Sequence, residues 1–300
     1  MNMKWMRCIV ACLLLAVIGC SSQQESRHLQ GEVSDIDPGV IDVMTFNIRF
    51  GTANDGMNRW DNRRELVVDV IEEHDPDILG LQEALDFQVN YISKEMPEYD
   101  VYYVCRDDGA KQGESSAIFY RENRFKLTDS GTFWFSDTPS EPSAHWGNKH
   151  LRICSWVQLI DKKDNISFYV YNLHLDHVSQ NSREKSTILL AEKISRRKHS
   201  DPYIVMGDFN MSLSNPGIKY LLKNDVDTPY APLVSAWHRK HPQLDTRTGH
   251  GFKGITEGAA IDHILVEEKT SVINATIDQR AINGRYPSDH YPVISRVKLY

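Results

Sequence analysis

The chain has 300 residues, of which 34 are basic and 41 are acidic, for a formal net charge of −7 at pH 7. This acidic balance argues against a protein whose main task is to grip long stretches of nucleic acid, because that task normally requires a basic face. The length suits one large domain or two small ones behind an export segment. The sequence has no internal repeat, low-complexity block or second linker, which favours one domain.

The first 20 residues have the pattern of an export signal. Two basic residues precede an apolar run over residues 9–18, which is too short to span a bilayer at about 20 residues but suits a secretory signal. The segment VIGC at 17–20 resembles a bacterial lipobox, so we predict a signal peptide over 1–19 and lipidation of Cys20. An ordinary cleaved signal or a short buried helix is the alternative.

Residues 20–38 are polar and contain almost no large apolar side chains, so they cannot bury enough surface to fold. We predict that they form a lipidated flexible tether and that a folded domain occupies residues 39–300. The protein would then be exported and lipid-anchored to a bacterial membrane, with the outer membrane favoured and its face left open. We expect a monomer that contacts the membrane only through this anchor.

The next elements alternate between strand and helix patterns. Residues 41–47 (IDVMTFN) predict a strand, and residues 63–74 place four apolar side chains on one helical face before Pro76. Residues 77–83 (DILGLQE) form a short apolar run typical of a buried strand. Apolar residues then recur at helical spacing from Leu85 to Met96, which predicts a second helix.

The second half of the chain continues the alternation. Residues 166–176 predict a long strand, and a helix is expected from Asn181 to about Lys198, opening with a capping-box-like Asn-x-x-Glu. Further strands are predicted at 203–210, 261–266 and 291–299. Strands outnumber helices, which suits packed sheets with helices outside them.

Two cysteines remain after the export segment, Cys105 and Cys154, and both lie in apolar, strand-like surroundings. An exported protein can join such residues in a disulfide, but the sequence does not show whether they are close. Two buried free thiols are the equal alternative.

A small set of polar residue types recurs at, or directly beside, the ends of the predicted strands. A single Asp in such a place normally serves a turn, but several ends with the same chemistry favour a common site, because strand ends converge in space. The residues are Asn47, Glu83, His174, Asp208, Asn210, Asp262, Asp289 and His290.

The residue types indicate the chemistry of this site. Carboxylate and amide oxygens without thiolates suit a hard cation such as Mg²⁺. An imidazole near a carboxylate has its protonated form favoured, and so suits binding of a negatively charged oxygen. A metal ion together with imidazolium groups can neutralise charge on a phosphorus centre as water attacks it.

Six stretches carry a resemblance to a known family, in that family's order and across almost the whole chain after the tether. They are MTFNIR (44–49), DILGLQE (77–83), NLHLDH (172–177), GDFN (207–210), IDHILV (261–266) and SDHYPV (288–293). With them the chain resembles the endonuclease/exonuclease/phosphatase superfamily, which includes pancreatic deoxyribonuclease, abasic-site endonucleases, deadenylases, inositol polyphosphate phosphatases and bacterial sphingomyelinases.

The resemblance implies an α/β fold, a four-layer sandwich of two facing mixed β-sheets with helices on the outer faces, over the catalytic domain 39–300. It also implies a metal site. Glu83 would be the principal metal carboxylate, with Asn47 beside it, and Asp289 would serve the metal or the leaving group. The expected ion is Mg²⁺, with Mn²⁺ as the alternative.

The same resemblance implies roles around the phosphate. Asp208 would align or deprotonate the attacking water, and Asn210 would hold the phosphate or a second metal. His290 would contact the phosphoryl oxygen, with Asp262 hydrogen-bonded behind it to set its tautomer and charge. His174 would be the second phosphate-binding histidine.

Other residues have weaker assignments. Arg152 resembles an arginine near the phosphate in family members, although a surface ion pair is the alternative. Asn172 shares a strand face with His174 and is either substrate-binding or structural. On strand alternation His177 and His263 should point away from the site.

Two further segments stay open. The segment 58–64, with three arginines and a tryptophan, is either a solvated helix start or a substrate-facing surface. The aromatic residues of 131–150 either contact substrate or lipid, or cap the core beneath a long loop.

The expected activity is metal-dependent hydrolysis of a phosphate ester by activated water. Phosphodiesters are favoured, as in a nuclease, and candidate substrates are nucleic-acid fragments, phospholipid headgroups and sugar or inositol phosphates. A phosphomonoesterase acting on sugar or inositol phosphates is the alternative, and so is a non-catalytic binding module on the same fold. A serine hydrolase is disfavoured because the chain has no Gly-x-Ser-x-Gly.

Overall fold

The structure is a computed structural model that describes residues 38–222 and 232–300. The predicted signal peptide, the predicted lipidation site Cys20 and all of the predicted tether except its last residue lie outside the described residues. The chain from Asp37 to Tyr300 forms one compact unit. Among the described helices, none has the length and apolar character needed to cross a membrane.

Two six-stranded sheets carry the fold. In the first sheet the strands run in the order β11-β12-β1-β2-β4-β3. Only β1 and β2 are parallel neighbours, and the other pairs are antiparallel. The strands are β1 (Val40–Asn47), β2 (Ile78–Leu85), β3 (Tyr99–Tyr102), β4 (Glu114–Arg121), β11 (Ser271–Ile277) and β12 (Val293–Lys298).

The second sheet repeats this plan in the order β5-β6-β7-β8-β10-β9. Here β7 and β8 are the parallel pair, again at the centre of an otherwise antiparallel sheet. The strands are β5 (Phe125–Trp134), β6 (Ile153–Asp161), β7 (Ser167–His174), β8 (Tyr203–Asp208), β9 (Leu233–Ser235) and β10 (Asp262–Glu267).

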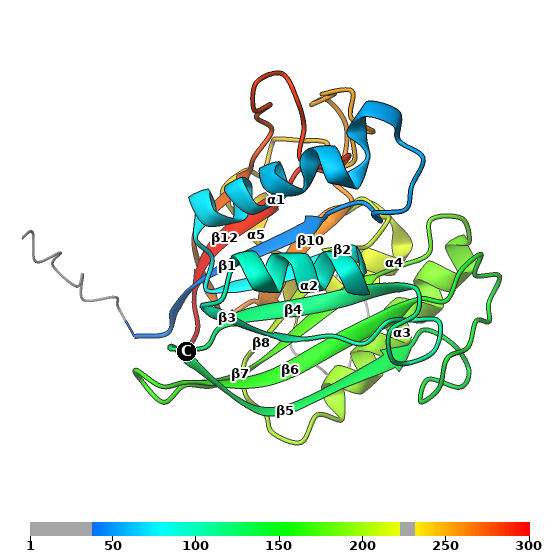
Figure 1. The fold of residues 1–300 in the computed structure, drawn as a ribbon. Coiled ribbons are helices and arrows are strands. Elements are labelled where there is room, and N and C mark those ends of the chain that lie inside the picture. The colour runs from blue at the N-terminus through cyan, green and yellow to red at the C-terminus, as the bar shows by residue number, and fades with distance from the viewer. Residues whose placement is uncertain (1–37, 223–231) are drawn as a thin grey trace, which may run out of the picture. The chain divides into compact units, whose positions relative to one another are not determined.

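Helices form the outer layers. Because parallel neighbours need a crossover connection, α1 (Trp60–His74) joins β1 to β2 and α3 (Gln180–Ser195) joins β7 to β8. Both α1 and α2 (Asp86–Glu95) pack on the first sheet, whereas α3 and α4 (Pro216–Leu222) pack on the second (Figure 1). Short pieces complete the set, η1 (Gly56–Asn58) and α5 (Ala236–Lys240). The predicted four-layer α/β sandwich is confirmed.

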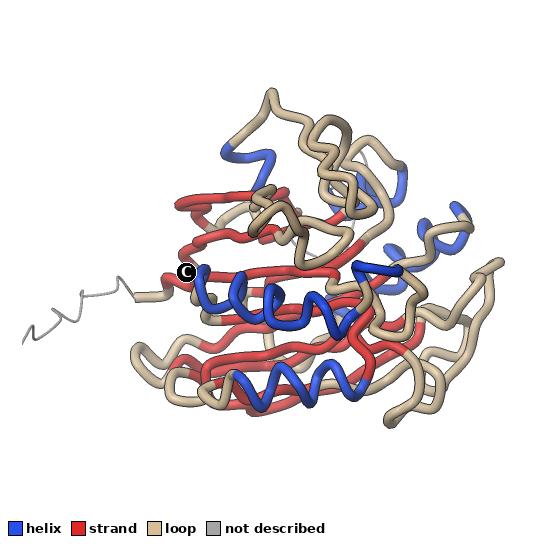
Figure 2. The backbone as a smooth tube through the Cα atoms, turned by 45° about the horizontal axis from the view of Figure 1, so that its top comes forward, coloured by secondary structure: helices blue, strands red, loops and turns tan. Residues whose placement is uncertain are grey.

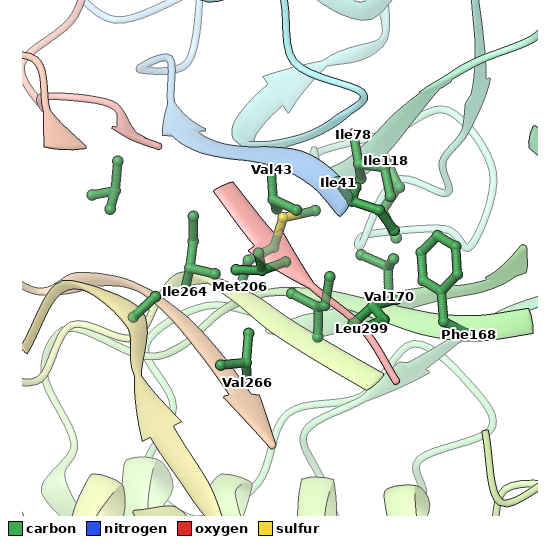
Figure 3. Packing of buried hydrophobic residues seen from close by; sticks show 14 of the residues in the cluster. Ile41, Val43, Ile78, Ile118, Phe168, Val170, Met206, Ile264, Val266 and Leu299 are labelled. Carbon is green, nitrogen blue, oxygen red and sulfur yellow. The ribbon is translucent and has the colours of Figure 1, made fainter. Parts of the chain in front are cut away.

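The main core lies between the two sheets. Aliphatic side chains of the first sheet, such as Val43 and Ile78, face Val170, Met206 and Ile264 of the second (Figure 3). These strands are buried on both faces, and this explains why their sequences are nearly continuous apolar runs rather than alternating ones. Burial of this area supplies most of the driving force for folding.

The predicted helices exist, with corrections at their starts. The first helix begins at Trp60 rather than residue 63. The third begins at Gln180, and its N-cap is Ser179, whose hydroxyl accepts a hydrogen bond from the Ser182 N–H. The capping box predicted at Asn181 is therefore wrong, because the hydroxyl of Ser179, two positions earlier, caps the helix by accepting from the Ser182 N–H.

The segment 131–150 is divided between strand and loop. Phe133 and Trp134 end β5, and both are buried together with Phe135, so these aromatics belong to the core. Trp146 is only half-buried. Cys105 and Cys154 are buried free thiols, which decides the question left open by the sequence.

Candidate active site

The topology brings the predicted polar residues to one edge of the sandwich. Parallel β1 and β2 both end there, and so do β7 and β8. The antiparallel partners β12 and β10 begin at the same edge, and Asp262 is paired in register with Asp208. Long loops gather at this side of the unit, away from the C-terminus (Figure 2). Ligands bind at such strand ends in many α/β proteins.

A pocket of about 220 Å³ lies at this edge and is lined almost entirely by polar side chains. Seven of the predicted residues line it directly: Glu83, Arg152, His174, Asp208, Asn210, Asp289 and His290. Asn47 and Asp262 lie immediately behind it through hydrogen bonds to lining residues.

Asn47 connects the two sheets at the floor of the pocket. Its buried side-chain nitrogen lies 3.2 Å from Glu83 Oε1 and 3.0 Å from Asp208 Oδ2, and donates to both carboxylates. Glu83 also accepts a hydrogen bond from the Phe50 backbone N–H at 3.0 Å. The side-chain amide of Asn47 therefore joins Glu83 of the first sheet to Asp208 of the second.

Unusual backbone conformations aim these side chains. Glu83 has φ of +59° at a break in the β2–β4 register, so a bulge turns its carboxylate toward the pocket. Asn210 has φ of +50° and is held by a hydrogen bond from its N–H to Asp208 Oδ1 at 2.8 Å. Conformations of this kind cost about 1–3 kcal/mol each and concentrate at functional sites.

Gly207 explains why a glycine precedes Asp208. Its φ is +142°, and a Cβ at this position would lie 2.0 Å from the carbonyl oxygen of Leu173 on the neighbouring strand. No side chain fits there. The close approach of β7 and β8 brings His174 and Asp208 together, with 3.5 Å between His174 Nε2 and Asp208 Oδ2.

His290 is set up to carry a positive charge. Its Nδ1 donates to Asp262 Oδ2 at 2.8 Å, which leaves Nε2 for the pocket. Burial by itself would lower the pKa of His290, but Asp262, Asp208 and Asp289 outweigh burial and hold that pKa well above its usual value. An imidazolium is therefore fixed at the pocket wall.

His174, in contrast, is neutral. Burial, followed by the nearby cations Arg152 and Arg106, holds the pKa of His174 well below its usual value. The protonated form favoured beside a carboxylate does not apply to His174, because burial and then the two arginines disfavour the cation there. His290 and His174 therefore differ in charge state, one imidazole being charged and the other neutral.

The pKa of the Asp208 carboxyl is strongly raised. Burial, and then repulsion from Asp262, raises the pKa of Asp208 to about 7, although His290 opposes this shift. A carboxylate with a pKa near neutrality can both take up and release a proton under ordinary conditions. Asp208 lines the pocket, which makes it a candidate general base.

A group of oxygen donors suits a divalent cation. Arg49 lies between two carboxylates, 3.9 Å from Glu83 and 3.7 Å from Asp289. Burial raises the pKa of Asp289, and the neighbouring Glu83 raises it further. Crowded carboxylates with no thiolate among them have the chemistry that Mg²⁺ or Mn²⁺ requires.

A second set of potential ligands is less suitable. Donor atoms of Asp208, Asp262 and His290 lie within 4.8 Å of one another. However, His290 Nδ1 and Asp262 already form a hydrogen bond with each other, and an imidazolium cannot coordinate a metal. Within the described residues, Glu83 and Asp289 therefore form the better candidate metal site.

Several pocket residues were missed from the sequence: Arg49, Phe50, Glu114, His150 and His177. His177 was expected to point away on strand alternation, and this is wrong. The strand ends at His174, and Asp176 then accepts hydrogen bonds from Val178 and Ser179, which forms a turn. The turn directs His177 into the pocket, where its Nδ1 lies 3.0 Å from Arg152 Nη2.

Glu114 and Arg106 form a largely buried ion pair that no sequence motif predicted. Two hydrogen bonds of 2.6 and 2.8 Å join the Arg106 guanidinium to the Glu114 carboxylate. Glu114 Oε2 in turn lies 3.8 Å from His174 Nδ1. The pairing arises from strand β4 and a loop before it, so only the folded chain reveals it.

Asn172 does not face the pocket, so its assignment as a substrate-binding residue is corrected. It is fully buried between the sheets, where its side-chain nitrogen donates to the carbonyl oxygens of Leu81 and Ala117. Its oxygen accepts a hydrogen bond of 2.7 Å from Gln82. Asn172 therefore joins the two sheets.

Burial decides the roles of Arg63 and His263. Arg63, from the segment 58–64, is 1% exposed and donates to four backbone carbonyls, including Ile48 and Pro287, so it stabilises loops rather than facing substrate. His263 is buried and contacts the Met211 carbonyl at 2.8 Å, outside the pocket as expected.

The chain is similar to known proteins over most of its length. A solved structure described as an endonuclease/exonuclease/phosphatase from Bacteroides vulgatus matches with a TM-score of 0.80 and 30% identity, covering 87% of this chain and 99% of that one. A mannosyl-6-phosphatase from Bacteroides thetaiotaomicron matches with a TM-score of 0.77 and 30% identity, covering 86% and 99%.

A curated relative matches over a smaller region. The CCR4-Not complex 3'-5'-exoribonuclease subunit Ccr4 of Emericella nidulans is 24% identical over 203 residues, which are 57% of this chain and 30% of that protein. A sequence model of the Endonuclease/Exonuclease/phosphatase family matches residues 44–290. This range contains every pocket-lining residue, and the resemblance inferred from the six motifs is confirmed. The chain belongs to the Endonuclease/Exonuclease/phosphatase family.

Proposed function

We propose that this phosphate-ester hydrolase removes phosphoryl groups from small phosphomonoesters, in particular sugar phosphates, with a divalent metal ion. The observation that carries the proposal is the pocket itself. It measures about 220 Å³ and combines Arg152, Arg49 and the charged His290 with few apolar contacts. A small phosphomonoester matches this volume better than a polynucleotide does, and a bound divalent cation would offset the four acidic residues of the lining, Glu83, Glu114, Asp208 and Asp289.

Two further observations support a small substrate over nucleic acid. The protein is acidic overall, with a net charge of −7, whereas binding along a phosphodiester backbone depends on a basic face. The mannosyl-6-phosphatase of Bacteroides thetaiotaomicron is similar over 86% of this chain, at 30% identity. The phosphodiesters favoured from the sequence remain the second candidate.

The metal would be held by Glu83 and Asp289, with Asn47 as a neighbouring amide. Mg²⁺ is the ion that their oxygens fit best, and Mn²⁺ is the alternative. A divalent ion bound there supplies positive charge that polarises the phosphate and offsets the charge that develops on it.

The protein groups then have separate tasks. Asp208 accepts a proton from the attacking water, because its carboxylate lies on the pocket floor and has a pKa of about 7. Asn47 donates to both Asp208 and Glu83 and holds them in position. Asn210 is fixed beside Asp208 and offers its amide to the phosphate.

The histidines and Arg152 stabilise the anion. His290, held protonated by Asp262, donates from Nε2 to a phosphoryl oxygen as negative charge accumulates. His174 is neutral and donates from Nε2 with little repulsion toward the nearby cations. Arg152 is 3% exposed and is kept at the pocket by His177.

A substrate panel tests the proposal. Purified protein would be stripped with EDTA and supplied with Mg²⁺ or Mn²⁺. Mannose 6-phosphate, inositol phosphates, p-nitrophenyl phosphate, bis-p-nitrophenyl phosphate, sphingomyelin, RNA and single-stranded DNA would be compared by kcat/KM. We expect metal-dependent turnover that is highest on a sugar phosphomonoester. Faster turnover of a diester or of nucleic acid would refute the monoesterase assignment.

Variants test the roles. Asp208→Asn and His290→Ala should each lower kcat/KM by about 10³-fold or more without changing the circular dichroism spectrum. His238→Ala, at an exposed histidine outside the pocket, is the matched control and should retain full activity. Near-normal activity of either pocket variant would remove its assigned role.

We further propose that the protein is exported and lipid-anchored through Cys20, as its N-terminal sequence predicts. Metabolic labelling with radioactive palmitate tests this directly. Label should appear in the membrane fraction with the natural sequence and disappear with Cys20→Ser, whereas label that persists in the variant would exclude this anchor.

A further inference from the structure

A second cavity, larger than the catalytic pocket, lies elsewhere in the described part of the chain. A groove of about 910 Å³ lies on the outer face of the second sheet, between α3 and the stretch 129–146. Its lining shares no residue with the catalytic pocket. The volume is near the top of the range of roughly 300–1,000 Å³ that ligand sites occupy.

The floor of this groove is an aromatic platform whose accessible ring is Trp156, because Tyr169 and Tyr171 beside it are only 1% and 2% exposed. Trp156 of β6 is paired with Gly131 of β5, and a Cβ at Gly131 would lie 2.8 Å from the indole ring. The missing side chain therefore lets the half-exposed indole lie against the strand. Tyr169 lies beside Trp156 with 6.0 Å between ring centroids, and Tyr171 stacks on Tyr169 at 6.2 Å.

The wall opposite this platform is charged. The groove is lined by five basic residues, Lys185, Lys193, Arg196, Arg197 and Lys198, and by three acidic ones, Asp129, Asp137 and Glu192. Lys185 lies 5.6 Å from the Trp146 ring and Lys193 lies 5.5 Å from the Phe133 ring.

Two of the basic side chains are available to a ligand. Arg196 and Lys198 are exposed at the end of α3. Neither side chain takes part in a hydrogen bond or ion pair with another described residue. The excess of positive charge at the groove contrasts with the net charge of −7 of the chain.

We infer that this groove binds an oligosaccharide that carries an anionic group such as a phosphate. A sugar ring has an apolar C–H face that packs on an aromatic plane, and its hydroxyl groups donate to carboxylates and accept from ammonium and guanidinium groups. The exposed Arg196 and Lys198 provide the charge complement of one anionic group.

The acidic wall residues discriminate against a polynucleotide. Asp129, Asp137 and Glu192 repel a continuous row of phosphates, whereas sugar hydroxyls form hydrogen bonds with the same carboxylates. Aromatic stacking alone would suit a saccharide or a nucleic acid. The mixed charge of the wall is what favours the saccharide. The groove would hold the enzyme on an anionic glycan independently of catalysis.

Tryptophan fluorescence tests the inference, because Trp146 and Trp156 both line the groove. The probes are a mannose tetrasaccharide, the same tetrasaccharide with a terminal 6-phosphate, and an octathymidylate. Metal-free protein is used, so that hydrolysis does not interfere and the outcome does not depend on the proposed activity. We expect saturable binding of both saccharides, tighter for the phosphorylated one, and weaker binding of the oligonucleotide.

Variants locate the site and separate its two features. Trp156→Ala should weaken binding of both saccharides about tenfold through loss of the stacking surface. Arg196→Glu combined with Lys198→Glu, at exposed positions that folding tolerates, should weaken the phosphorylated saccharide about tenfold and the neutral one less than about twofold. Trp237→Ala, at a half-buried tryptophan outside the groove, is the matched control and should bind normally.

Two outcomes would overturn the inference. Tighter binding of the oligonucleotide than of either saccharide, lost in the same variants, would make the groove a nucleic-acid site. Absence of saccharide binding, or binding unaffected by both sets of groove variants, would show that the groove does not recognise saccharides. Each result is readable even if the protein hydrolyses no phosphomonoester.

Discussion

Replacement of Asn172 by Ala separates its structural role from the substrate-binding role suggested by its sequence motif. The change removes three buried hydrogen bonds, two donated to Leu81 and Ala117 and one accepted from Gln82. Each such bond contributes about 0.5–1.5 kcal/mol net, and buried carbonyls left without donors add to the loss. The free energy of unfolding should therefore fall by about 3–4 kcal/mol.

Urea unfolding followed by circular dichroism measures this loss, and a melting curve should show a decrease of about 10 °C for a domain of this size. Because Asn172 does not line the catalytic pocket, kcat/KM at 25 °C should stay within about threefold of the unmodified protein. Asn90→Ala, at an exposed asparagine on α2, is the matched control and should change stability by less than about 0.5 kcal/mol.

A different pattern would refute the reasoning. If Asn172→Ala lowered kcat/KM about 100-fold while changing the unfolding free energy by less than about 1 kcal/mol, the side chain would act on substrate. The Asn172 side chain would then have to leave its place between the sheets and reach the pocket. Loss of stability with normal activity below the melting temperature supports the structural role.

Three further changes test other parts of the structure. Gly207→Ala should lower the unfolding free energy by about 3 kcal/mol or more in urea titrations, because its Cβ would lie 2.0 Å from a carbonyl of β7; a loss below about 1 kcal/mol would contradict the observed backbone. Burial alone would raise the pKa of Asp278, but hydrogen bonds from Arg280 and His74 hold it well below its usual value. Its contribution to stability is therefore present above the unfolded pKa of about 3.9 and is lost as the pH falls through the folded pKa. Asp278→Asn should cost about 2 kcal/mol at pH 7 and less at pH 2, where the carboxyl of the unfolded chain is protonated, and an equal cost at both would refute the charge argument. Millimolar Mg²⁺ should raise the melting temperature of the natural protein but not of Glu83→Gln, and an equal rise in both would place the ion elsewhere.

The difference in charge state between His290 and His174 has an electrostatic origin. His290 lies among the carboxylates of Asp262, Asp208 and Asp289, whereas His174 lies beside the guanidinium groups of Arg152 and Arg106. Both histidines are next to an acidic residue in space or sequence, so local sequence does not distinguish them. The difference depends on which distant charges the fold brings to each ring.

Hydrophobic patterning predicted the central strands of both sheets and three outer helices, but not the strands β4, β5, β9 and β11. The four-layer sandwich itself followed from the family resemblance. Long apolar runs bounded by polar residues predicted the strands that are buried on both faces, and helical spacing predicted α1, α2 and α3. The polar residues at strand ends predicted one common pocket, because strands that end at the same edge must bring those residues together. These features depend on periodicity and chemistry along the chain, which a sequence contains directly.

The direction of individual side chains depended on the tertiary structure. Strand alternation failed for His177 because a turn follows β7, and it could not show that Asn172 faces the opposite sheet rather than the pocket. The approach of Glu114 to His174 of the other sheet, and the groove beside Trp156, come from segments far apart in the chain. Charge states, buried hydrogen bonds and cavities are sums over such long-range contacts, so they exist only once the sheets have packed.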